Sequence, residues 1–132
     1  SKAPKEAEAA ECAGKQGGNA AFFKFVDGVY EVTPGSNGLD LAQLPVIAKS
    51  IGLDVAAFNQ CLNSGEFSKK VADSYTEAIA LGAQGTPYTV IMVGEDSVVL
   101  SGAQPYDSMR AAIDSVLGSL ETPASPATPT AQ

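Results

Sequence analysis

The stretch GTPYTVIMV at residues 85–93 decides the fold of this chain, because helical sequence gives way to a strand there. Its apolar, largely β-branched run at residues 89–93 is typical of a strand. Pro87 lies just before that run, and the beginning of a strand is one of the few places where a sheet tolerates proline. The stretch alone leaves two interpretations open. Pro87 either ends the preceding helix with a trans peptide bond or forms a rigid corner with a cis bond.

Apolar residues at helical spacing predict helices on both sides of this stretch. The predicted helices cover residues 5–16, 19–30, 40–51, 55–64, 66–81 and about 105–120. Pro45 should kink its helix or delay the start of that helix. The turn-like residues 94–96 connect the strand to a second apolar run at residues 97–100, and so short a connection predicts an antiparallel hairpin.

Composition excludes several functions. The 132 residues carry a net charge of −7, which argues against nucleic acid or an anionic membrane as a partner. The chain has no histidine, so histidine-based catalysis and most zinc sites are excluded. Its aspartates do not cluster in a metal-binding loop, and we predict neither a metal nor a cofactor. Because the chain starts at Ser1 rather than Met, we expect a mature, processed or shortened chain.

The predicted hairpin poses a structural problem. Residues 89–93 are apolar on both faces, which is typical of an interior strand that is buried on both sides. A two-stranded hairpin by itself is only marginally stable in water. No other segment of the sequence is predicted to be a strand that could lie along the second edge. We therefore expect that a strand is missing or that a partner supplies it.

Four motifs in this order resemble the second half of a DsbA-like thiol–disulfide oxidoreductase of the thioredoxin superfamily. The motifs are EAAECA at residues 8–13 followed by Gln16 and Gly17, IGLD at 51–54 followed by Phe58 and Cys61, GTP at 85–87, and GAQP at 102–105. The resemblance runs from about residue 3 to residue 120. Each motif is weak alone, and the four in this order are fairly specific.

The resemblance implies an α+β fold of the thioredoxin-like, DsbA type, in which a helical insertion joins an incomplete thioredoxin core. Residues 1–65 resemble the insertion domain, and residues 66–120 resemble the C-terminal ββα half of the core. Residues 121–132 form a Pro/Thr/Ala-rich tail, which we expect to be a linker or a disordered end. The first half of the family's core, which holds the C-x-x-C motif, has no counterpart here.

The resemblance also assigns candidate site residues. It implies that Pro87 is cis and that Thr86 and Pro87 contact the substrate. The family's reactive thiolate is the first cysteine of C-x-x-C, at the N-terminus of a helix. Cys12 and Cys61 lie instead within predicted helices, on their apolar faces. We therefore expect no catalytic residue in this chain.

Some members of the family carry a second, non-catalytic disulfide, so the resemblance implies a structural Cys12–Cys61 bond. Such a bond would indicate an oxidising compartment. Two other interpretations remain open: a pair of buried free thiols that behave as small apolar residues, or a redox-active pair.

The parent function implied by the resemblance is oxidation or isomerisation of protein disulfides in an extracytoplasmic compartment: the periplasm, the cell envelope or the secreted fraction. Its partners would be protein thiols and disulfides, and this chain would carry the cis-Pro substrate-binding side without the catalytic motif. The alternative is a non-catalytic thioredoxin-like binding or scaffold module. It would complete its sheet with a second copy or with a partner strand.

Overall fold

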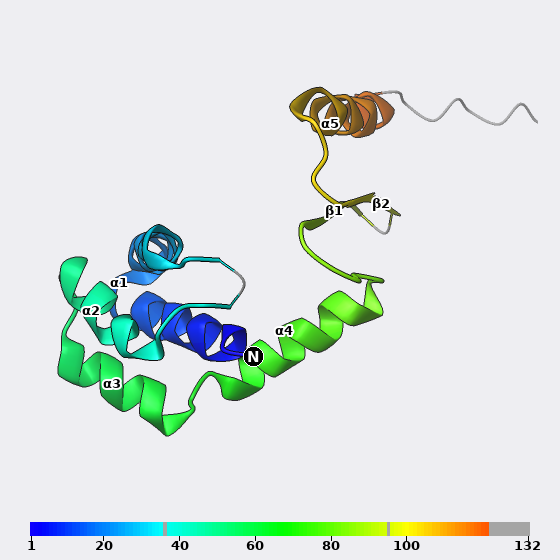
Figure 1. The fold of residues 1–132 in the computed structure, drawn as a ribbon. Coiled ribbons are helices and arrows are strands. Elements are labelled where there is room, and N and C mark those ends of the chain that lie inside the picture. The colour runs from blue at the N-terminus through cyan, green and yellow to red at the C-terminus, as the bar shows by residue number, and fades with distance from the viewer. Residues whose placement is uncertain (36, 95, 122–132) are drawn as a thin grey trace, which may run out of the picture. The chain divides into compact units, whose positions relative to one another are not determined.

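Helices and one β-hairpin make up the computed structural model, which describes residues 1–35, 37–94 and 96–121 (Figure 1). The elements in chain order are α1 (Ala3–Val32), the 3-10 turn η1 (Leu41–Gln43), α2 (Leu44–Ser50), α3 (Val55–Ser64), α4 (Ser68–Ala80), β1 (Tyr88–Val93), β2 (Asp96–Ser101) and α5 (Tyr106–Glu121). The chain divides into two units, Ser1–Ala78 and Ile79–Gln132, and the boundary falls in the last turn of α4. No helix of the described ranges is long and apolar enough to cross a membrane. Glu121, the first residue of the predicted tail, ends α5, and the rest of that tail lies outside the described residues.

A bend divides α1 into two helical arms, in agreement with the two helices predicted on either side of the glycine pair. Gly17 and Gly18 depart from helical geometry, and Gly18 has a φ of +66°. A Cβ atom at Gly17 would lie 2.6 Å from the Cβ atom of Ala21, so the bend leaves no room for a side chain there. The sequence therefore places glycine where the backbone must turn.

The first unit has an apolar core of its own, built by α1, α2 and α3 (Figure 1). Its largest fully buried side chains are Phe25, Phe58, Leu39, Leu44 and Cys12. The rings of Phe25 and Phe58 lie with their centroids 5.4 Å apart. Side chains from all three helices thus pack into one hydrophobic core.

Local capping explains where α2 and α3 begin. Pro45 lies in the first turn of α2, where its missing N–H is not needed, and the 3-10 turn precedes it. The prediction that Pro45 delays the helix is therefore confirmed. The Asp54 carboxylate accepts a hydrogen bond of 3.0 Å from the backbone N–H of Ala57 and caps α3. Gly65, with a φ of +69°, ends that helix.

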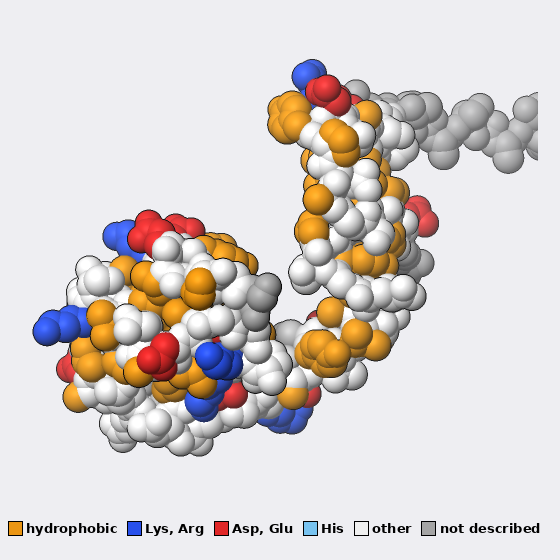
Figure 2. All heavy atoms as spheres, viewed as in Figure 1, with side chains coloured by type: hydrophobic (Ala, Val, Ile, Leu, Met, Phe, Trp, Pro, Cys, Tyr) orange, Lys and Arg blue, Asp and Glu red, His pale blue; other side chains and the backbone are white. Residues whose placement is uncertain are grey.

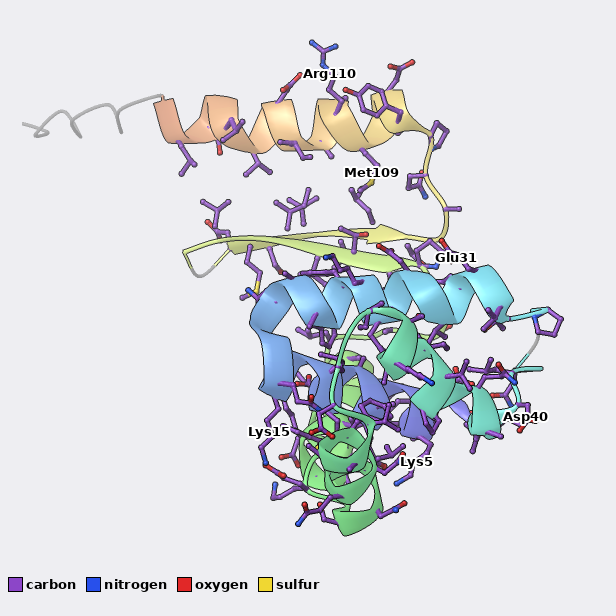
Figure 3. All side chains as sticks on the ribbon, turned by 90° about the vertical axis from the view of Figure 1, so that its left-hand side faces the viewer. Lys5, Lys15, Glu31, Asp40, Met109 and Arg110 are labelled. Carbon is purple, nitrogen blue, oxygen red and sulfur yellow. A yellow bond between two sulfur atoms is a disulfide. The ribbon has the colours of Figure 1, made fainter. Side chains whose placement is uncertain are left out.

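The second unit contains the predicted antiparallel hairpin, which is confirmed. Tyr88 is opposite Ser101, and Val93 is opposite Asp96. Ile91 and Val93 share one face of β1 and line a groove of about 320 Å³ together with side chains of α5. Figure 3 shows Met109 on the side of α5 that faces the hairpin and Arg110 on the opposite side.

The expectation that the first strand is buried on both sides is wrong for this structure. Met92, on the face of β1 opposite to Ile91, is 70% exposed. Side chains of α5 lie over the face that carries Ile91 and Val93, and no such cover lies over Met92 among the described residues of the second unit. Hydrophobic side chains consequently reach the surface over the hairpin and α5 (Figure 2).

Candidate functional site

The Thr86–Pro87 turn lies between the end of α4 and the start of β1, and both of its residues are exposed. The peptide bond between them is cis. The backbone N–H of Gly102, just beyond β2, donates a hydrogen bond of 2.9 Å to the carbonyl oxygen of Pro87. The hairpin therefore holds one side of the turn through a backbone contact and leaves both side chains accessible.

Tyr88 holds the other side of the turn, and the sequence analysis did not single it out. Its hydroxyl donates a hydrogen bond of 2.7 Å to the carbonyl oxygen of Leu81, immediately after α4. This bond links two residues seven positions apart across the loop that carries Thr86 and Pro87. The only sequence signal for it is an amphipathic tyrosine at the first strand position after the proline.

The turn offers exposed backbone groups and no reactive side chain. The side chains of residues 85–93 carry no charge at neutral pH, and none of them is a thiol or an imidazole. No hydrogen bond joins the Thr86 backbone to another described residue. Free backbone groups at the start of a strand with an unpaired edge can bind an extended peptide as a further strand. The turn can therefore bind an extended peptide through its backbone groups.

Cys12 and Cys61 are joined by a disulfide, with their Cα atoms 5.9 Å apart. The bond connects α1 to α3, and both cysteines are buried. Because the chain has only these two cysteines, it has no free thiol. The structure brings Cys12 next to Cys61 within the first unit. Thr86 and Pro87, which are adjacent in the sequence, belong to the second unit.

Polar contacts surround the disulfide within the first unit. Lys15 forms an ion pair with Glu66, with 2.6 Å between Nζ and Oε2. The Gln16 amide donates to the Asp54 carbonyl oxygen and accepts from the Asp54 N–H, at 3.1 Å in each case. These contacts join α1 to the start of α3 and to the segment after it. Figure 3 shows Lys15 beside α3. Several contacts in addition to the disulfide therefore connect α1 to α3 and the segment that follows it.

No group of three or more potential metal ligands among His, Cys, Asp and Glu occurs within the described ranges. The candidate site consequently rests on the turn and the strand edge alone.

Comparison with known proteins identifies the family. Residues 9–114 match the family described as the DSBA-like thioredoxin domain. The match covers more than half of the 132 residues, and the chain belongs to this family. The predicted fold class, α+β with a DsbA-like thioredoxin fold, is confirmed. No curated protein matches the chain.

The solved structures that are similar to this one include two bacterial proteins. DsbA2 of Pseudomonas aeruginosa aligns with a TM-score of 0.73 at 27% identity, over 91% of this chain and 66% of that chain. A putative protein disulfide isomerase from Nitrosomonas europaea aligns with a TM-score of 0.67 at 19% identity, over 87% of this chain and 57% of that chain. The second similarity shows the fold alone. This chain spans less than two thirds of the length of either neighbour.

Proposed function

We propose that this chain is the substrate-binding side of a DsbA-like thiol–disulfide oxidoreductase, and that Thr86 and Pro87 contact the substrate protein. The observation that carries the proposal is the exposed Thr86–Pro87 turn at the start of β1, in a chain of the DSBA-like thioredoxin family. The backbone of this turn has groups that can pair with an extended segment. The neighbour named DsbA2 supports the same assignment.

In thiol–disulfide exchange, a substrate thiolate attacks one sulfur of a C-x-x-C disulfide and forms a mixed disulfide. The second substrate thiolate then attacks the mixed disulfide, which oxidises the substrate to a disulfide and leaves C-x-x-C reduced. This chain contains no C-x-x-C motif, and its two cysteines are bonded to each other. Its part in the reaction is therefore to hold the segment of substrate next to the reacting cysteine, and it is inactive alone.

The proposal extends to location and domain organisation. A buried disulfide that links two helices suits an oxidising, extracytoplasmic compartment. Residues 1–65 would be the helical insertion, and residues 66–120 would be the ββα half of the core. A strand outside this sequence would pair with the open edge of β1 and complete the sheet.

Peptide binding tests the proposed contact. The probe is a seven-residue peptide of Thr and Val with a central Ser, blocked at both ends and labelled for fluorescence anisotropy. We expect wild-type chain to bind it and Thr86→Arg to weaken binding at least about tenfold, because a long charged side chain would fill the contact position. Thr76→Arg, on the exposed surface of α4, is the matched control and should bind like wild type. Equal binding by both variants would contradict the role of Thr86.

Insulin reduction tests the absence of a nucleophile. With dithiothreitol as the reductant, the chain should not accelerate insulin precipitation above the uncatalysed rate, because both sulfurs are buried in one disulfide. Turnover that disappears in a Cys12→Ala/Cys61→Ala variant would show that this pair is redox-active.

A second candidate function rests on the open edge of β1. The exposed Met92 and the single partner strand favour a non-catalytic binding module that completes its sheet with a second copy or a partner strand. Sedimentation equilibrium distinguishes the first of these arrangements. A dimer that Met92→Lys converts to a monomer would favour the scaffold function, and a monomer across the micromolar range would count against self-pairing.

A further inference from the structure

The loop between α4 and β1 carries the candidate site, and hydrogen bonds hold its ends. At its beginning, the Gly82 N–H donates to the Ile79 carbonyl oxygen at 2.9 Å. From its far end, the Tyr88 hydroxyl reaches back to the Leu81 carbonyl oxygen at 2.7 Å. This is the only side-chain hydrogen bond between described residues that involves residues 81–88. One hydroxyl thus closes the loop into a ring.

The backbone at Gly82 makes room for this closure. Gly82 has a φ of +89°, a conformation that side chains other than glycine rarely adopt. A Cβ atom at this position would lie 3.2 Å from the Tyr88 hydroxyl oxygen. Any larger residue would therefore strain the backbone and crowd the hydroxyl. The backbone conformation of Gly82 and the absence of a side chain there thus both allow the Tyr88 hydroxyl to reach Leu81.

The opposite side of the turn is held by backbone atoms alone. The Gly102 N–H donates to the Pro87 carbonyl oxygen at 2.9 Å. Pro87 is therefore fixed on the side of β2 whatever side chains surround it. On the side of α4, the position of Thr86 depends on the conformation of residues 82–85. The hydrogen bond from Tyr88 to Leu81 joins the two ends of this segment.

We propose that Tyr88 is a positioning residue for substrate binding: its hydroxyl closes the α4–β1 loop and thereby presents Thr86 and Pro87 to an extended protein segment. Tyr88 itself does not contact the substrate in this proposal. The inference rests on the proposed function, because it assigns a purpose to the loop that carries the proposed contact.

Tyr88→Phe is the test variant, because it removes the hydroxyl and keeps the aromatic ring. Tyr106→Phe is the matched control, since Tyr106 belongs to the same unit and is 78% exposed. Amide hydrogen exchange of the free 132-residue chain is measured first. We expect Gly82 to exchange about three- to tenfold faster in Tyr88→Phe, the range for the loss of one hydrogen bond. Gly102 should keep its rate, because its N–H is bonded to the Pro87 carbonyl oxygen independently of Tyr88. Amides within α5 should keep their rates, and Tyr106→Phe should match wild type.

Two exchange results would overturn the proposal. An unchanged rate at Gly82 would show that the hydroxyl does not close the loop. A uniform increase throughout the hairpin and α5 would show that Tyr88 only stabilises its unit.

Affinity for the labelled Thr/Val peptide is measured second, with the same two variants. We expect Tyr88→Phe to bind about three- to tenfold more weakly than wild type and Tyr106→Phe to bind equally well. Equal binding by Tyr88→Phe would overturn the positioning role and leave the proposed function intact. Failure of wild-type chain to bind would overturn the proposed function, and the exchange rates would still decide whether Tyr88 closes the loop.

Discussion

The units Ser1–Ala78 and Ile79–Gln132 bury their apolar side chains to very different extents. Every buried apolar residue of the described ranges lies between Ala9 and Leu62, in the first unit. In the second unit, apolar side chains of β1, β2 and α5 remain partly or largely exposed. The first unit therefore has a core and a disulfide of its own. The second has no fully buried apolar side chain among its described residues.

The largest expected effect concerns the core of the first unit. Phe25 is 0% exposed and packs against Phe58, whereas Phe23, on the same helix, is 63% exposed. Phe25→Ala should lower the free energy of unfolding by about 3–5 kcal/mol, because it leaves a cavity. Phe23→Ala should cost at most about 1.5 kcal/mol, since it loses one edge contact with Phe22. Urea denaturation followed by circular dichroism measures both. Equal losses of unfolding free energy would contradict the difference in burial between Phe25 and Phe23.

The next effect concerns the disulfide. It closes a loop over a sequence separation of 49, so the Cys12→Ala/Cys61→Ala variant should lose about 4 kcal/mol of stability in the chain-entropy estimate. Hydrogen exchange resolves where the loss falls. Amides of α1 and α3 should lose protection, while those of β1 and β2 should not. Equal loss in the hairpin would show that the two units unfold together.

A smaller effect concerns the cap of α3. Asp54→Ala should cost about 1 kcal/mol, because the N–H of Ala57 loses its acceptor. Asp54→Asn retains a side-chain oxygen at the cap and is the matched control, with an expected cost below about 0.5 kcal/mol. The same urea titration measures both variants. If the two substitutions cost the same, the carboxylate has another role.

The smallest effect is expected on the exposed face of the hairpin. Met92→Ser should change the free energy of unfolding by no more than about 0.5 kcal/mol, because the side chain is 70% exposed. Ile91→Ser, on the face that lines the groove with α5, should cost more. Thermal unfolding of both variants measures the difference in stability between substitutions on the two faces. A large loss for Met92→Ser would show that the chain covers this face in solution.

Local sequence was sufficient to predict most elements. The helices and the hairpin follow from periodicity, and the glycine pair at residues 17 and 18 correctly separates two helical arms. The prediction that Pro45 delays the start of α2 is correct, because the effect of a proline depends on its neighbours along the chain. The family followed from four short motifs in order, and the family match confirms it.

Features that depend on contacts between distant residues were not predictable. The apolar run of β1 indicated burial on both sides, yet Met92 is exposed, because burial of a strand face depends on which element packs over it. The hydrogen bond from Tyr88 to Leu81 depends on the path of the intervening loop, which no periodicity encodes. The roles of Thr86 and Pro87 stay predictions that rest on the family.

The most direct test of the central claim, that this chain binds substrate at the Thr86–Pro87 turn and performs no exchange, is a peptide titration followed by amide NMR. The blocked Thr/Val peptide is added to the 132-residue chain, and shifts are mapped onto the sequence. We expect the largest shifts at Thr86, Tyr88 and Gly102, with the amides of α1 and α3 unmoved. Shifts confined to α1 and α3, or no shifts at all, would show that the turn does not bind the peptide.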